Sequence, residues 1–225
     1  MSLMIYTSDN AFKKVIKKEF NLLLNLFDFD PNTIPPYKIE ITIIDSLEEF
    51  LEIYKKEYKS NPPEYVVGFA TSNGRIFILN KKLFENRGHL TEEFEKVILH
   101  ELSHIFVRRI LDPKYTFMWI QEGLCQYLAF KDKEFKISKF IDFRKIETKE
   151  NWKKFPAYQQ SAAFFKFLSE NYGFEKIIQF IKLIKQKGEY KAFNELFGDF
   201  KEVQEKFLKS LKSENENPTS PRNTL

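Results

Sequence analysis

The sequence predicts an α+β fold that is mainly helical, with a small sheet confined to its N-terminal half. Two observations carry this prediction. Runs of β-type residues, either alternating or continuously apolar, occur in YKIEITII, VVGFA and RIFILN, all in the N-terminal half. From Thr91 onward, the apolar residues recur at helical spacing instead.

Helices and strands are expected to alternate in the N-terminal half. Apolar residues at helical spacing predict a helix from Ala11 to Phe27, after which DPNTIPP interrupts the chain. The isoleucine-rich alternation from Tyr37 to Ile44 predicts a strand. A capping serine followed by two acids predicts a helix from Ser46 to Tyr58. VVGFA and RIFILN, joined by TSNG, predict a β-hairpin.

The C-terminal half is expected to be helical. Acids at its start and two arginines at its end predict a helix from Thr91 to Ile110, and Asp112 with Pro113 stops it. The same periodicity predicts later helices over Thr116 to Phe130, Ala157 to Tyr172, Glu175 to Lys187 and Phe200 to Leu211. The polar tail that begins at Ser213, SENENPTSPRNTL, is predicted to be disordered.

Composition limits the class of protein. The 225 residues suit one domain, and 25 phenylalanines predict an aromatic core. A net charge of +4 with mixed lysine and glutamate argues against a nucleic-acid-binding face. No apolar run approaches the roughly 20 residues of a membrane span, and the N-terminus lacks the pattern of a secretory signal. With Cys125 as the single cysteine, a reducing compartment is the default, so we expect a cytoplasmic protein.

The segment HELSH contains two of the three histidines in the chain. On a helix, His100 and His104 lie one turn apart on one face, so both imidazoles can reach one metal ion. Glu101 is turned about a quarter of the circumference away. It lies too far round to be a third ligand, yet close enough to hydrogen-bond a water held by the metal. That is the position of a general base in zinc hydrolysis.

A catalytic zinc needs a third protein ligand, because one of its four positions is kept for water. The expected source is Glu122, in WIQEGLCQYLA at the start of the next helix. Gly123 would cost this helix roughly 1 kcal/mol relative to alanine, so its presence suggests a close backbone approach beside the metal.

HELSH followed by WIQEGL, with seventeen residues between His104 and Glu122, resembles the gluzincin metallopeptidases, especially the small peptidase MA-like domains. It is more distantly similar to zinc aminopeptidases and thermolysin-like peptidases. The resemblance implies one Zn²⁺ per chain, bound by His100, His104 and Glu122, with Glu101 as the general base. Because no G-x-M-E-N motif occurs, aminopeptidase activity is not implied.

The resemblance also implies a zincin-like (gluzincin) fold with a small twisted N-terminal sheet and a helical C-terminal lobe. The expected organisation is a single catalytic domain over residues 1–212, with an α/β lobe over about 4–110, a helical lobe over 111–212 and a tail over 213–225. The implied activity is hydrolysis of a peptide or protein substrate. In such peptidases an edge strand binds the substrate backbone, and either run of the hairpin could supply it.

A second catalytic residue follows from the same resemblance. AYQQSAAFFKFL resembles the element of the family that carries an oxyanion-binding tyrosine, and this points to Tyr158. An ordinary core tyrosine is the alternative. Cys125, one turn after Glu122, could face the ion, but it is interpreted as a buried bystander. Gln126 is a candidate hydrogen-bond partner of a ligand histidine, and His89 is interpreted as a surface residue rather than a substrate contact.

Two other functions stay open on the sequence alone. One is a catalytically inactive zinc-binding interaction module of the same fold. The other is a helical binding protein in which HELSH is accidental.

Overall fold

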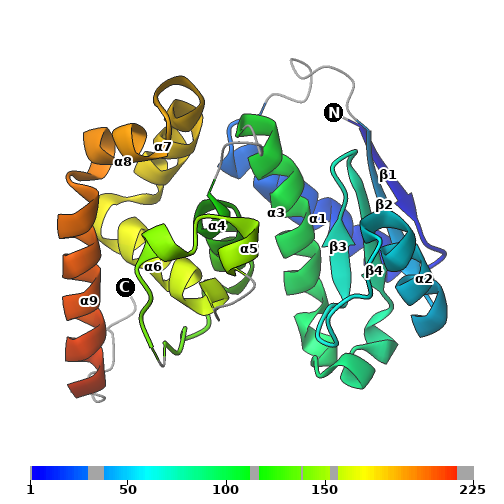
Figure 1. Cartoon of the computed structure of the whole chain (residues 1–225). Helices are drawn as coiled ribbons and strands as arrows, with labels where there is room; N and C mark the ends of the chain where they lie inside the picture. The colour runs from blue at the N-terminus through cyan, green and yellow to red at the C-terminus, as the bar shows by residue number, and fades with distance from the viewer. Residues whose placement is uncertain (1, 30–37, 112–116, 138, 153–156, 217–225) are drawn as a thin grey trace, which may run out of the picture. The chain divides into compact units, whose positions relative to one another are not determined.

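The computed structural model describes residues 2–29, 38–111, 117–137, 139–152 and 157–216. The chain divides into two compact units: residues 1–109 with 125–133, and residues 110–124 with 134–225. Helix α4 (Met118–Phe130) contributes residues to both units. Strands occur in the first unit and further helices in the second, which confirms the predicted α+β, mainly helical class (Figure 1).

The sheet of the first unit has four strands: β1 (Ser2–Tyr6), β2 (Lys38–Ile44), β3 (Gly68–Ala70) and β4 (Arg75–Leu79). Their order is β1-β2-β4-β3. β1 is parallel to β2 and β2 to β4, whereas β3 is antiparallel to β4. The predicted hairpin is therefore present, and β3 is its edge strand.

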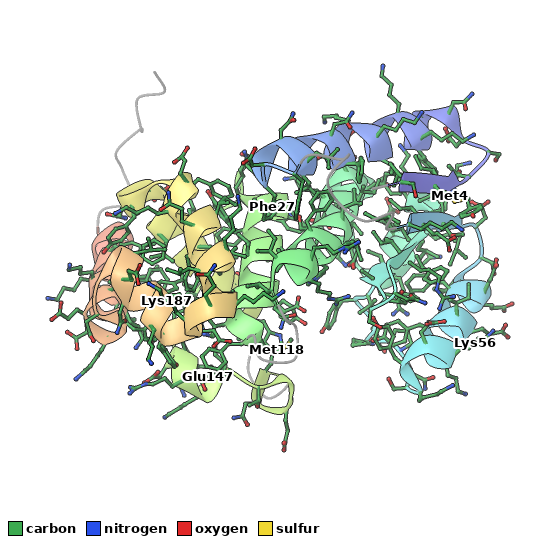
Figure 2. The ribbon with its side chains drawn as sticks, turned by 90° about the horizontal axis from the view of Figure 1, so that it is seen from above. Met4, Phe27, Lys56, Met118, Glu147 and Lys187 are labelled. Carbon is green, nitrogen blue, oxygen red and sulfur yellow. The ribbon has the colours of Figure 1, made fainter. Side chains whose placement is uncertain are left out.

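Three long helices cover this sheet. α1 (Asn10–Leu26) and α3 (Phe94–Ile110) lie on one face, and α2 (Leu47–Tyr58) lies on the other (Figures 1 and 2). α1 packs against α3 through Phe20 and Phe106, whose ring centroids are 5.8 Å apart. Between β4 and α3 the chain forms three short 3₁₀ turns, at Lys81–Leu83, Glu85–Arg87 and Thr91–Glu93.

The second unit is helical. Besides the first part of α4, it contains α5 (Lys149–Trp152), α6 (Ala157–Tyr172), α7 (Phe174–Lys187), α8 (Glu189–Phe197) and α9 (Phe200–Glu216), with a 3₁₀ turn at Phe143–Lys145.

Aromatic side chains form the core of each unit, as the composition predicts. Most of the largest fully buried side chains are phenylalanines. In the helical unit Phe164 is completely buried between Phe143 and Phe207, with ring centroids 4.7 and 5.2 Å away. Trp119 of α4 joins this cluster, 5.0 Å from Phe143.

Besides the 3₁₀ turns, three elements were not expected from the sequence, β1, α5 and α8. One helix ends later than expected. α9 continues to Glu216, so residues 213–216 are helical where the sequence predicts a disordered tail. The remainder of that tail, residues 217–225, lies outside the described residues. Within the described parts of the chain, none of the helices has the length and apolar character needed to cross a membrane.

Candidate metal centre

The two histidines of HELSH lie in the middle of α3, one helical turn apart. Their Nε2 atoms are 3.1 Å from each other, and the two rings are nearly perpendicular, with an interplanar angle of 89°. In a tetrahedral zinc site with Zn–N bonds of about 2.0–2.1 Å, two coordinating nitrogens are about 3.3 Å apart. The observed separation is close to that value, so both Nε2 atoms suit one ion.

Glu122 on α4 completes this group. His100, His104 and Glu122 each offer one ligand atom, and these atoms all lie within 4.8 Å of one another. Two imidazole nitrogens and a carboxylate oxygen are the donor set of a catalytic zinc site that keeps one position for water. Among the described residues this is the single group of three or more histidine, cysteine or acidic side chains so arranged. The three predicted ligands are therefore brought together in a group that could hold a metal ion.

The site is partly enclosed. His104 is 6% exposed and Glu101 is 8% exposed, while His100 and Glu122 are half-buried. A buried imidazole and a buried carboxylate need polar or metal partners, because burial without them is costly. His100 and Glu122 therefore keep part of their surface exposed.

Glu101 lies beside the edge strand. A Cβ atom built on Gly68 of β3 would be 3.2 Å from Glu101 Cγ and 2.9 Å from Val97 Cγ1. Only glycine permits β3 to come this close to α3 at that point. Burial, and then the charges of Tyr65 and Glu101, raise the pKa of the Tyr54 phenol, so Tyr54 lies within electrostatic reach of the Glu101 carboxylate.

The backbone of β3 presents an open edge next to Glu101. The Val67 carbonyl accepts from the N–H of Leu79 at 2.9 Å, and the Thr71 N–H donates to the carbonyl of Arg75 at 2.8 Å, so both face β4. Because alternate residues of a strand direct their backbone groups to opposite sides, those of Gly68 and Ala70 face away from β4. The sequence did not decide which run of the hairpin forms the edge strand. In the structure it is VVGFA.

Two side chains close part of this edge. The Tyr58 hydroxyl, from α2, and the Arg108 guanidinium, from α3, each donate a hydrogen bond of 3.0 Å to the Ala70 carbonyl. Arg108 is four residues after His104 and therefore continues the face of α3 that bears the histidines. The N–H and carbonyl of Gly68 and the N–H of Ala70 remain directed outward for pairing with another extended chain.

His89 is not the surface residue that the sequence predicts. It is half-buried, with Nδ1 2.8 Å from Glu93 Oε2 and Nε2 2.6 Å from the Tyr65 carbonyl oxygen, and so anchors the segment before β3. Glu93 also forms an ion pair with Lys133. Burial raises the pKa of the Glu93 carboxyl, but its hydrogen bonds to Lys133 and His89 outweigh burial and lower the pKa below the usual range.

The close approach predicted at Gly123 is present, but its neighbour is α6 and not the metal ligands. A Cβ on Gly123 would lie 2.6 Å from Ser161 Cβ and 3.0 Å from the Ser161 backbone carbon. This glycine therefore permits tight helix packing within the helical unit.

Cys125 contacts His104, which was not expected from the sequence. It is fully buried, as predicted, but its Sγ lies 3.4 Å from Nδ1 of His104. A position three residues after Glu122 was the available signal, since residues three apart share a helix face. The partnership predicted for Gln126, which is half-buried, stays a prediction.

Tyr158 lies on α6 and is half-buried. Its ring packs edge-on against Trp152, with the centroids 4.9 Å apart. This contact suits an ordinary packed tyrosine as well as a catalytic one, so its role at an oxyanion stays a prediction.

In comparisons with known proteins, no protein-family model matches the chain and no curated protein matches its sequence.

Proposed function

We propose that this chain is a zinc-dependent metallopeptidase, cytoplasmic as the sequence predicts, that hydrolyses peptide bonds. The observation that carries the proposal is the grouping of His100, His104 and Glu122, with the two histidine Nε2 atoms 3.1 Å apart. A structural zinc site would have four protein ligands, whereas three ligands beside a buried glutamate suit hydrolysis.

Zinc bound by these residues would lower the pKa of a water molecule to about 7 and polarise the carbonyl of the substrate. Glu101 takes the proton from the attacking water and passes it to the leaving amine. Tyr158, in the role that the family resemblance implies, donates a hydrogen bond to the oxygen that becomes negative.

The substrate is an extended peptide that pairs with β3. Gly68 and Ala70 supply outward backbone groups, and Gly68 lies in contact with the Glu101 side chain. A peptide added to this edge would pass next to the general base, and pairing would depend on its backbone rather than on one side chain. The Ala70 carbonyl, already bonded to Tyr58 and Arg108, takes no part in this pairing.

The first experiment measures metal in protein purified without chelators. One zinc per chain is expected, and His100→Ala should lose it, because two protein ligands hold zinc far more weakly than three. Protein that contains no stoichiometric metal, and that fails to take up added zinc, would remove the basis of the proposal.

The second experiment compares cleavage of a broad peptide library by the wild type and by Glu101→Gln. The variant should keep its zinc and lose cleavage by a factor of about 10² or more, because the base is removed and the ligands remain. Glu95→Gln, an exposed glutamate on the same helix, is the matched control and should cleave normally. Zinc binding without cleavage by any of the three proteins would favour the inactive zinc-binding interaction module.

A further inference from the structure

Cys125 contacts the metal-site histidine on the side of its ring away from the other ligands. His104 Nε2 is 3.1 Å from His100 Nε2, and His104 Nδ1 is 3.4 Å from Cys125 Sγ. The two ring nitrogens therefore have separate partners: one faces the ligand group and the other faces the thiol.

This division has a chemical consequence for His104. A neutral imidazole carries its proton on one nitrogen and a lone pair on the other. Coordination through Nε2 requires the proton on Nδ1, and a hydrogen-bond acceptor next to Nδ1 stabilises that tautomer and fixes the ring orientation. Sulfur is a weak acceptor, but here the contact is fully buried, where hydrogen bonds are stronger electrostatically than in water.

Helix geometry relates this contact to the third ligand. Glu122 and Cys125 are three residues apart on α4, so they share one face of that helix. A single helix therefore supplies one ligand and the hydrogen-bond partner of another.

We propose that Cys125 is a positioning residue for His104, holding it with Nδ1 protonated and Nε2 directed to the metal. The inference rests on the proposed zinc site and adds to it a residue that acts through a ligand. A carboxylate or amide commonly has this role beside a metal-bound histidine. Here a buried thiol occupies the position.

The test measures zinc affinity by chelator competition in four proteins. Removal of the acceptor in Cys125→Ala should weaken binding by about 10–100-fold. Cys125→Ser keeps an acceptor and should bind within about threefold of the wild type. Ser103→Ala is the matched control: its buried hydroxyl bonds the Leu99 carbonyl and no ligand, so its affinity should be unchanged. Affinity of Cys125→Ala equal to that of the wild type would overturn the inference.

A second readout separates positioning from packing. In the zinc-free protein, ¹⁵N ring shifts should show His104 as the Nδ1-protonated tautomer in the wild type and in Cys125→Ser, and as a mixture in Cys125→Val. Valine fills the space without accepting a hydrogen bond, which keeps the comparison usable if Cys125→Ala fails to fold. The chain has only three histidines, so the spectrum is simple to assign. The same tautomer in all of these proteins would show that Cys125 only fills space.

The two proposals fail in different ways. Wild-type protein that binds no zinc contradicts the proposed function before any variant is compared. Wild-type protein that binds zinc with the same affinity as Cys125→Ala contradicts only the role of Cys125.

Discussion

Alanine at Gly68 should destabilise the sheet through one identifiable overlap. The added methyl carbon would lie 2.9 Å from Val97 Cγ1, where ordinary carbon contacts are about 3.5–4.0 Å. Overpacking of this kind costs about 1–3 kcal/mol, and the reduced entropy of the unfolded chain offsets about 0.4–1 kcal/mol of it. We therefore expect the free energy of unfolding to fall by about 1–2 kcal/mol.

Val97→Ala provides the second arm of a double-mutant cycle. Val97 is buried, and its truncation alone should cost about 2 kcal/mol. In Gly68→Ala/Val97→Ala the new methyl group occupies the vacated space. The loss of stability in the double variant should therefore be smaller than the sum of the two single losses, by at least about 1 kcal/mol. Simple additivity of the two changes would refute the overlap as the cause.

The assay must report on the first unit. Trp119 and Trp152 both belong to the helical unit, so their fluorescence follows that unit and not the sheet. Hydrogen exchange of the β4 amides measures the opening of the sheet directly.

The remaining contact of the new methyl group, 3.2 Å from Glu101 Cγ, should displace the glutamate slightly. The double variant is therefore expected to regain stability without regaining the full cleavage rate of the proposed peptidase.

Three further predictions concern other parts of the molecule. Gly123→Ala should lower the free energy of unfolding of the helical unit by about 2 kcal/mol or more, because its methyl group would meet the Ser161 backbone, which cannot move aside cheaply. Tryptophan fluorescence in urea measures this change, and an unchanged unfolding midpoint would contradict it. Glu93→Gln should cost about 1 kcal/mol at neutral pH. The pKa of Glu93 is lowered in the folded state. This stabilisation is therefore complete above the unfolded pKa of about 4.3 and is lost as the pH falls through the folded value. Zinc at 100 times its Kd should raise the free energy of unfolding by about 2.7 kcal/mol, and His104→Ala should abolish this increase in a thermal unfolding assay.

Local sequence signals were sufficient for most helices but not for every element. The expected range Ala157 to Tyr172 coincides with α6, because its apolar spacing is regular and Gly173 ends it. β1 has only five residues, SLMIY, and its sequence does not alternate apolar and polar residues, although their exposure alternates in the structure. It is a strand because β2 pairs with it, and that pairing joins distant parts of the sequence. α8 begins one residue after α7 ends, and periodicity alone does not show the break at Gly188.

The residues of the candidate metal site also differ in how far the local sequence identifies them. His100 and His104 follow from helix geometry within five residues. Glu122 required a pattern that spans two helices, which the family resemblance supplied. Helical spacing suggested Gln126 as the partner of a ligand histidine and left Cys125 as a buried bystander, although neighbouring residues differ by only about 100° around the axis. The rotation of α4 decides between them, and that rotation depends on packing that a linear pattern does not contain.

The packing of α4 explains why successive residues of QEGLC have separate tasks. Glu122 and Cys125 are about 60° apart around the helix axis, so one can offer a ligand atom to the proposed metal ion while the other reaches His104 Nδ1. Gly123, about 100° from Glu122, faces Ser161 instead, and its missing side chain sets how closely α4 approaches α6. If the proposals hold, a change at any of these three positions would have a different signature: loss of the proposed ligand at Glu122, loss of the proposed histidine orientation at Cys125, or loss of helix packing at Gly123. Because zinc affinity, the His104 tautomer and the stability of the helical unit are measured independently, those three roles can be separated by experiment.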